Sequence, residues 1–328
     1  MIKKETPATE VTKQIGLDRV SLSVHESEVK GLDGESLVLQ DDINIQDGTI
    51  VIKYSNPNKG LMIVNVNCPK LFNDTNEKNV TFEDLDYVIE LASDLLVSHG
   101  IMLDVRYSRL GSFEVNVNMN GLRFYYVMQL IAKANTNNNL KTFKVENKNG
   151  IQSVKINKNK YKVKIYKKSE HLQEQGQDVS EQYLVRFEVS TNDYAQKQRL
   201  MADDITMNGL INNWNDIERW FKVCMKETIK KPVERYLKDM ENECIKMLEQ
   251  GLKPSVVANT MIYRQDMLDM IVFDNAIRKY YKTIGKTKNV STTIKSTHNR
   301  LKKLDENRYL ETADNVSTLQ ELYEVLGI

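Results

Sequence analysis

The chain has 328 residues, 41% of them hydrophobic and 28% charged, with a formal net charge of +1 at pH 7. This length suits one large domain or two ordinary ones. No run approaches the roughly 20 apolar residues that cross a bilayer, and the first residues lack the apolar region of a signal peptide. Three scattered cysteines fit a reducing compartment. We therefore expect no membrane association and a cytoplasmic location.

Alternating apolar and polar residues dominate the first 200 positions, which predicts short strands around two helices. The expected strands cover residues 18–25, 48–54, 60–67, 102–106, 112–119, 142–147, 152–156, 161–168 and 183–190. The expected helices cover residues 81–99 and 122–134.

After about residue 193 the apolar residues recur at helical spacing, as in Trp214, Ile217, Trp220, Phe221 and Cys224. The pattern predicts an α+β fold, with a helical domain over residues 201–328. Its segment 255–281 could form a helix-turn-helix, or the helices could simply pack on the sheet; the sequence leaves both open.

Three of the predicted strands carry polar side chains on one face, because side chains alternate along a strand. These polar sets are Glu114, Asn116, Asn118 and Asn120; then Lys162, Lys164, Tyr166 and Lys168; and then Arg186, Glu188 and Ser190. If the strands share one sheet, they bring a tyrosine hydroxyl, two carboxylates and several lysines together. Such groups can cut a phosphodiester through a tyrosine nucleophile with a divalent metal.

Two segments are strongly basic. Residues 141–168 hold ten lysines and one acid, and residues 278–303 hold nine Lys or Arg and no acid. Aromatic residues lie within both, including Phe143 and Tyr166 in the first and Tyr280 in the second. Basic patches with aromatics favour contact with phosphates and stacking on bases, so we expect a nucleic-acid partner.

Three short motifs in order resemble the replication proteins of filamentous phages of the gene II type and their phage and plasmid relatives. They are Ser108-Arg-Leu followed by Phe113-Glu114, then Ile165-Tyr-Lys-Lys-Ser-Glu170, then Leu184-Val-Arg-Phe-Glu188. The likeness covers roughly residues 15–200. It implies an antiparallel-sheet nicking and origin-binding domain over residues 1–200, flanked by helices, which starts rolling-circle replication.

The resemblance also implies a role for each residue. Tyr166 would be the nucleophile that stays joined to the 5′ phosphate, helped by Lys164 and Lys168. Glu114 and Glu188, with Asn116 as a weaker third ligand, would hold Mg²⁺ or Mn²⁺, which prefer oxygen ligands. The predicted DNA contacts are Lys160, Lys162 and Arg186, although Arg186 could instead orient a carboxylate.

The chain departs from that family group at two points. It has no His-hydrophobic-His pair, the metal motif of many rolling-circle initiators. In addition, Gly111 and Ser112 separate Ser108-Arg-Leu from Phe113-Glu114, so either a bulge restores the register or Glu114 is not the ligand.

Two other classes of function remain open. The chain could bind an origin or operator without cutting it, or it could be a structural or partner-binding protein of a mobile element. No complete Gly-x-x-x-x-Gly-Lys-Ser/Thr phosphate loop occurs in the sequence. A nicking enzyme of this kind would therefore need origin DNA, a host helicase and a DNA polymerase as partners.

Overall fold

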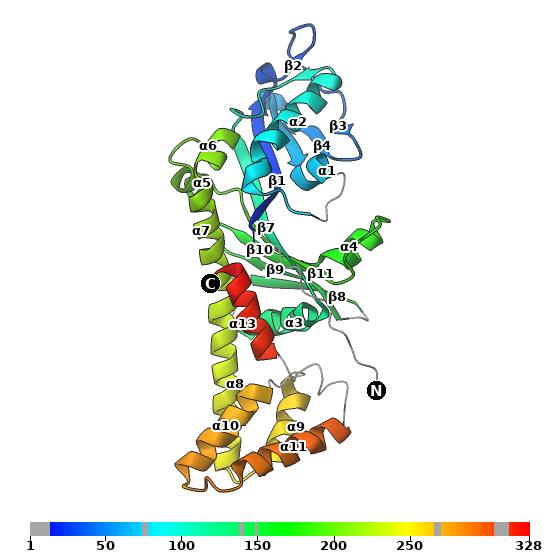
Figure 1. Ribbon diagram of the computed structural model, residues 1–328. Coiled ribbons are helices and arrows are strands. Elements are labelled where there is room, and N and C mark those ends of the chain that lie inside the picture. The colour runs from blue at the N-terminus through cyan, green and yellow to red at the C-terminus, as the bar shows by residue number, and fades with distance from the viewer. Residues whose placement is uncertain (1–13, 74–77, 138–140, 148–149, 266–269, 305–314) are drawn as a thin grey trace. The chain divides into compact units, whose positions relative to one another are not determined.

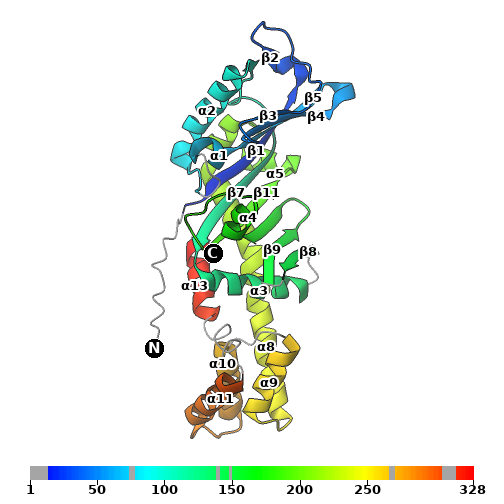
Figure 2. The same ribbon diagram turned by 90° about the vertical axis from the view of Figure 1, so that its right-hand side faces the viewer.

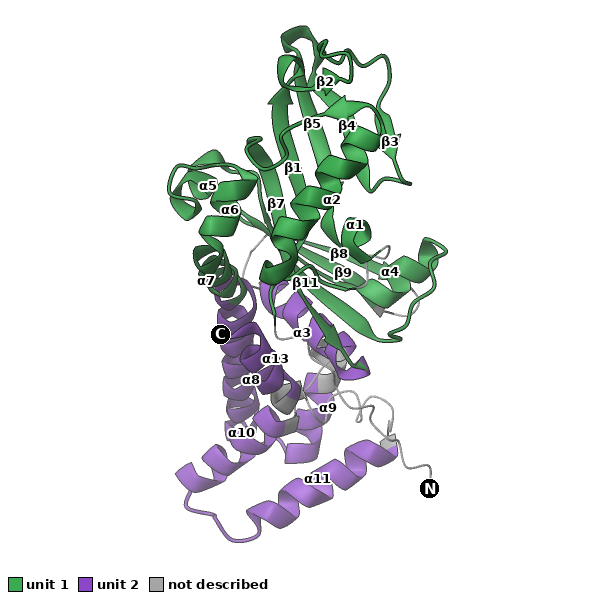
Figure 3. Cartoon of the chain, turned by 45° about the horizontal axis from the view of Figure 1, so that its top comes forward, with its two compact units in different colours: residues 1–121, 143–225 green, residues 122–142, 226–328 purple. Residues whose placement is uncertain are grey.

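The structure, a computed structural model, describes residues 14–73, 78–137, 141–147, 150–265, 270–304 and 315–328 (Figure 1). It has the α+β fold that the sequence predicts. The chain forms two compact units, coloured separately in Figure 3. Unit 1 comprises residues 1–121 and 143–225, and unit 2 comprises residues 122–142 and 226–328.

A nine-stranded antiparallel sheet is the main feature of the strand-rich part. Its strand order is β3-β4-β5-β1-β7-β11-β10-β9-β8. The first five strands in this order are β3 (Ile43–Ile45), β4 (Ile50–Asn56), β5 (Leu61–Asn67), β1 (Gly16–His25) and β7 (Leu110–Asn120). The other four are β11 (Leu184–Thr191), β10 (Lys162–Lys167), β9 (Gly150–Asn157) and β8 (Lys141–Asn147). A separate pair joins β2 (Lys30–Gly31) to β6 (Ile101–Met102).

One face of this sheet is apolar, as expected when an antiparallel sheet covers a core on one side. Val20 of β1 pairs with Phe113 of β7, and the buried side chains Val115, Val117, Val163 and Ile165 alternate along β7 and β10. The ring of Trp220 on helix α7 (Trp214–Met225) meets the Phe113 ring edge-on, with the centroids 5.5 Å apart. The polar residues of the same strands must therefore point to the opposite face.

The remaining helices of unit 1 are α1 (Cys68–Asn73), α2 (Leu85–Ser98), α4 (Lys168–Glu174), α5 (Tyr194–Leu200) and α6 (Met207–Asn212). Helix α2 lies along the part of the sheet made by β1, β4 and β5 (Figure 1). Its buried residues Leu85, Val88, Ala92 and Leu96 recur at helical spacing. A capping box between Thr81 and Asp84 precedes it, as the sequence predicts.

Unit 2 is helical. It contains α3 (Leu122–Asn137), a π-helical turn at Lys226–Lys230, α8 (Lys231–Glu249), α9 (Pro254–Gln265), α10 (Met270–Thr283), α11 (Val290–Leu304) and α13 (Asn315–Leu326). Figure 2 shows α9, α10 and α11 gathered beside one end of α8. Arg123 of α3 forms an ion pair with Glu321 of α13, with Nη2 and Oε1 2.5 Å apart.

The two units do not follow the division into residues 1–200 and 201–328. Helices α5, α6 and α7 share a unit with the sheet, whereas α3 shares one with the C-terminal helices. Helices α9 and α10 cover the segment considered for a helix-turn-helix, but residues 266–269 between them lie outside the described part. Within the described ranges, no helix has the length and apolar character needed to span a bilayer.

Replacing Trp220 with Ala is expected to lower the free energy of unfolding by about 3–5 kcal/mol, because a ring packed against Phe113 and Tyr161 leaves a cavity. Urea denaturation measures the change. The matched control on the same helix is Val223→Ala, whose side chain is 53% exposed and should cost less than about 0.5 kcal/mol. Equal effects at both positions would contradict this packing.

Candidate active site

The antiparallel register brings the predicted polar residues into neighbouring rows on one face of the sheet. Asn116, Glu188 and Lys164 occupy paired positions on β7, β11 and β10. In the next row, Asn118 pairs with Arg186, which pairs with Tyr166. The strand pairing thus confirms the expectation that these three strands share one sheet and carry their polar residues side by side.

Tyr166 is 5% exposed, and its hydroxyl donates a hydrogen bond of 2.6 Å to Oε1 of Glu188. Burial is the main reason that the pKa of Tyr166 lies well above its usual value, and the negative charge of Glu188 adds to it. Burial also raises the pKa of Glu188, as does the nearby Asp18. The tyrosine therefore keeps its proton at neutral pH, beside a carboxylate that accepts protons more readily than usual.

The two lysines predicted to assist the tyrosine contact its ring and not its hydroxyl. Nζ of Lys164 lies 3.9 Å from the centroid of the Tyr166 ring and Nζ of Lys168 lies 5.6 Å from it. The resemblance implied that these lysines favour the ionised tyrosine. The raised pKa of Tyr166 contradicts this, because burial and the negative charge of Glu188 disfavour ionisation more strongly than the lysines favour it. Nζ of Lys164 also forms an ion pair with Glu188, 3.9 Å from its Oε2.

Lys168 does not lie on the tyrosine strand, as its alternation with Tyr166 had indicated. It is the first residue of α4, where it is 1% exposed. Burial, together with the positive charge of Arg186, lowers the pKa of Lys168 to about 7. At neutral pH it can therefore either hold or release a proton.

The register of Glu114 depends on a bulge at Gly111. Ser21 of β1 pairs with Ser112, but the next residue, Leu22, pairs with Leu110, so Gly111 is an extra residue in β7. A Cβ atom there would lie 3.2 Å from the carbonyl oxygen of Ser21, which favours glycine. The bulge therefore restores the register after Ser108-Arg-Leu, and Glu114 joins the polar face.

Lys197 of α5 holds this bulge from the side. Its Nζ donates to the carbonyl oxygens of Leu110, at 2.7 Å, and Gly111, at 2.5 Å. The side chain is nearly buried, and burial lowers its pKa, as does nearby Arg109. These bonds satisfy backbone carbonyls at the point where the β1–β7 ladder is interrupted.

Asp18 is the site residue that sequence reasoning missed. Simple alternation puts it on the apolar face with Val20 and Leu22. However, Leu17 pairs with Val115 and Arg19 with Glu114, so Asp18 is the extra residue of a second irregularity, in β1. The irregularity redirects its carboxylate toward Glu114 and Glu188, as bulges near active sites often do. The available signal was an acid in phase with the apolar residues at the start of this strand.

Arg186, predicted to touch DNA or to orient a carboxylate, is completely buried. Its Nη1 lies 2.5 Å from Oδ1 of Asp18, and its Nε donates to Oδ1 of Asn118 at 2.8 Å. In this structure its guanidinium is inaccessible to a nucleic acid. The geometry therefore favours the role of orienting Asp18.

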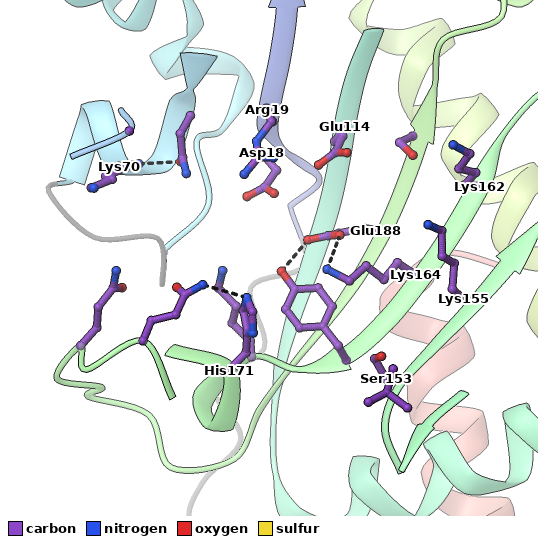
Figure 4. Close-up of a pocket in the computed structure, with 18 of the residues that line it drawn as sticks. Asp18, Arg19, Lys70, Glu114, Ser153, Lys155, Lys162, Lys164, His171 and Glu188 are labelled. Atoms are coloured by element: carbon purple, nitrogen blue, oxygen red, sulfur yellow. Dashed lines mark hydrogen bonds and ion pairs between the residues drawn. The ribbon is translucent and has the colours of Figure 1, made fainter. Parts of the chain in front are cut away.

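One oxygen from each of Asp18, Glu114 and Glu188 lies within 4.8 Å of the other two (Figure 4). Ligand oxygens on opposite sides of Mg²⁺ are roughly 4.2 Å apart, so the three carboxylates are close enough to share one ion after small adjustments. The amide of Asn116 is fully buried beside Glu188, and neither its oxygen nor its nitrogen has a hydrogen-bond partner among the described residues. This oxygen-rich, charge-crowded set fits a hard divalent cation.

Burial raises the pKa of Glu114 to about 7, with repulsion from Glu188 and Asp18 as further causes. A cation held by these groups would relieve that repulsion. The three carboxylates and Tyr166 lie at a cavity of about 1100 Å³ whose other walls include basic side chains. Figure 4 shows Lys155, Lys162, Lys164 and His171 around this cavity.

The predicted DNA contact Lys162 is exposed and lines the cavity. Lys160 is exposed as well and lines a smaller adjoining hollow of about 170 Å³, which shares Glu114, Lys162 and Ser190 with the main cavity. Unlike Arg186, both lysines are accessible to a polyanion that enters the cavity.

Neither a scan against protein-family models nor a search of curated proteins finds a match to this chain. What the site can do must therefore be argued from its own geometry.

Removing the carboxylate of Asp18 is expected to destabilise the fold, because the buried charge of Arg186 loses this ion pair. Asp18→Ala should lower the free energy of unfolding by about 3 kcal/mol, and a double variant with Arg186→Met should recover part of this loss. Denaturant titration of the two single variants and the double variant measures the coupling. Additive losses would show that the two side chains act independently.

Glu114 predicts a pH dependence of stability. Its folded pKa of about 7 exceeds the ordinary value of 4.5, so the folded state retains a proton that the unfolded state loses between these values. The free energy of unfolding should therefore fall as pH rises through that window. Glu114→Gln should remove this fall, leaving the variant relatively more stable by on the order of 2–3 kcal/mol above pH 7.

Denaturation in a metal chelator across this pH range measures the effect, with wild type and Glu114→Gln compared at each pH. The readout is the difference between the two profiles, so a constant offset caused by the substitution itself does not matter. Parallel profiles would contradict the raised pKa.

Proposed function

We propose that the chain is a metal-dependent DNA strand-nicking and strand-joining enzyme that initiates rolling-circle replication in the cytoplasm of a bacterial host. The observation that carries this proposal is the hydrogen bond from the Tyr166 hydroxyl to Glu188, beside two further carboxylates at a lysine-lined cavity. A nucleophile next to a base is the arrangement that covalent catalysis needs.

In the proposed reaction, Oη of Tyr166 forms a bond to the scissile phosphorus, and the bond from phosphorus to the 3′ oxygen breaks. The tyrosine proton passes along the existing hydrogen bond to Glu188, which is placed to act as the general base. The leaving oxygen takes a proton and becomes a 3′ hydroxyl, while the 5′ phosphate stays on the tyrosine. Because the phosphodiester energy is kept in the new bond, the reverse step can rejoin the strand.

A divalent cation, Mg²⁺ or Mn²⁺, held by Asp18, Glu114 and Glu188 would supply charge neutralisation at the phosphate. Asn116 is the further oxygen donor nearest to Glu188 in the strand register. Arg186 is fully buried and fixes Asp18, and its positive charge also lies close to Tyr166. Lys162, Lys164 and Lys155 line the cavity and would neutralise DNA phosphates on either side of the cut.

The positions of Lys164 and Lys168 over the ring suggest how the tyrosine is held. The amino groups lie 3.9 Å and 5.6 Å from the ring centroid, where each attracts the π face when it is protonated and so restricts rotation of the ring. A fixed ring keeps the hydroxyl in one direction, which is the requirement for attack in line with the leaving oxygen. Strand separation and synthesis would fall to a host helicase and a DNA polymerase.

The decisive test is covalent capture of DNA. Purified full-length protein is incubated with Mn²⁺ or Mg²⁺ and a supercoiled plasmid carrying the DNA that flanks this chain's own coding sequence. Tyr166→Phe should lower nicking and the 5′-linked adduct by on the order of a thousandfold or more, because it deletes the nucleophile. Denaturing gels without protease, followed by end-labelling, read both products.

Tyr161→Phe is the matched control, since Tyr161 precedes the same strand and its ring contacts Trp220 on the apolar side. It should nick at close to the wild-type rate. If both the wild-type protein and the Tyr166→Phe variant bind the plasmid but neither cuts it, the chain is a DNA-binding protein without nicking activity. If it is neither bound nor cut, the structural alternative gains.

A further inference from the structure

Helix α11 of unit 2 presents two opposite faces. Ile294, Thr297 and Leu301 are 6%, 4% and 4% exposed and fix its inner side. Since an α-helix turns by about 100° per residue, positions 292, 295, 296, 299, 300 and 303 fall on the other side. The six side chains at those positions border one hollow of about 440 Å³: Thr292, Lys295, Ser296, Asn299, Arg300 and Lys303.

We call these six residues the α11 stripe. Every one can donate a hydrogen bond, three are cationic, and none is apolar or acidic. The whole segment 278–303 carries nine basic residues without an acid. A surface of this composition attracts a polyanion and offers neutral donors that can approach base edges.

The helix is anchored from its inner side. Nε2 of His298 lies 2.8 Å from Oδ1 of Asp274 on α10, and Lys279 of α10 pairs with Glu241 of α8 at 2.7 Å. These contacts, with the buried apolar residues, fix α11 to α10 and α10 to α8. Asp274 and Glu241 are thus engaged with anchoring groups, while the six side chains of the stripe remain exposed.

We propose that the α11 stripe binds double-stranded DNA, with α11 lying in the major groove. Its 15 residues span roughly 22 Å, and the major groove of B-form DNA is about 12 Å wide and admits an α-helix. The deep, narrow major groove of double-stranded RNA does not. Insertion into a membrane interface would require apolar side chains on the exposed face, and the stripe has none.

This inference goes beyond the nicking reaction, because the stripe belongs to unit 2 and needs no chemistry. It gives the protein a duplex-binding surface separate from the cavity in which a single strand would be cut. Lys295, Arg300 and Lys303 are assigned to phosphates, and Asn299 and Ser296 are the neutral donors between them that can reach base edges.

The test is duplex binding by the full-length protein in a metal chelator, read as fluorescence anisotropy of a short labelled mixed-sequence DNA duplex over a series of salt concentrations. The triple variant Lys295→Gln, Arg300→Gln and Lys303→Gln should bind about tenfold or more weakly at moderate salt. The slope of log affinity against log salt should fall by about 2.7, since each lost phosphate contact contributes about 0.9.

The matched control removes the same charge from three other exposed residues of unit 2, as Lys238→Gln, Lys246→Gln and Lys253→Gln. It should leave the slope within error of wild type. Circular dichroism melts of both triple variants verify that they fold, which exposed positions favour.

Three results would overturn the proposal. The first is an unchanged salt slope in the stripe variant, and the second is an equal loss of duplex affinity in both triple variants. The third is that the stripe variant loses as much affinity for double-stranded RNA and single-stranded DNA as for duplex DNA. The first two exclude the stripe as a specific surface, and the third excludes its preference for duplex DNA. Because the assay contains no divalent metal and reads binding alone, its outcome is independent of whether Tyr166 cuts DNA.

Discussion

The buried guanidinium of Arg186 joins the strands that carry the polar cluster. From β11 it reaches Asp18 on β1 and Asn118 on β7. A cation removed from water is tolerated only where partners replace its hydration, so this contact fixes both the rotamer of Asp18 and the spacing of three strands. It also satisfies one carboxylate and leaves Glu114 and Glu188 crowded. The pKa values of both rise mainly because the two groups are buried, and repulsion from neighbouring carboxylates adds to the rise.

That crowding links the electrostatics of the cluster to its chemistry. Glu188 accepts the tyrosine hydrogen bond in a poorly hydrated place, so neither partner ionises as it would in water. Entry of positive charge at the carboxylates would lower the proton affinity of Glu188 and Glu114, whereas entry of a phosphate would raise it. The state of Tyr166 therefore depends on which ligands are bound, and the lysines at its ring face have little influence on its hydroxyl.

Strand alternation predicted the α+β fold and the common face of Glu114, Tyr166 and Glu188, because a period of two is fixed by backbone geometry. It could not predict Asp18 or explain Glu114, since each depends on an extra residue within a strand whose position is set by tertiary pairing. Lys168 was misplaced for a related reason: α4 begins there, and no cap signal marks its start. The burial of Arg186 depends on Asp18 and was equally hidden. The helices after residue 193 were recognised, but no periodic pattern reveals which compact unit a helix joins.

The bulge at Gly111 has a consequence for how such a strand can change over evolutionary time. Substitutions along β7 alter single side chains, but loss of Gly111 would rejoin Leu110 directly to Ser112 and restore strict alternation. The side chains before the deleted residue would then point to the opposite sheet face relative to the side chains after it. Leu110 and Glu114 could therefore not both keep their present surroundings. Lys197 would also lose one of the two carbonyls that it holds. The strand is therefore far more tolerant of replaced residues than of single-residue insertions and deletions, and length at this position should vary less than identity.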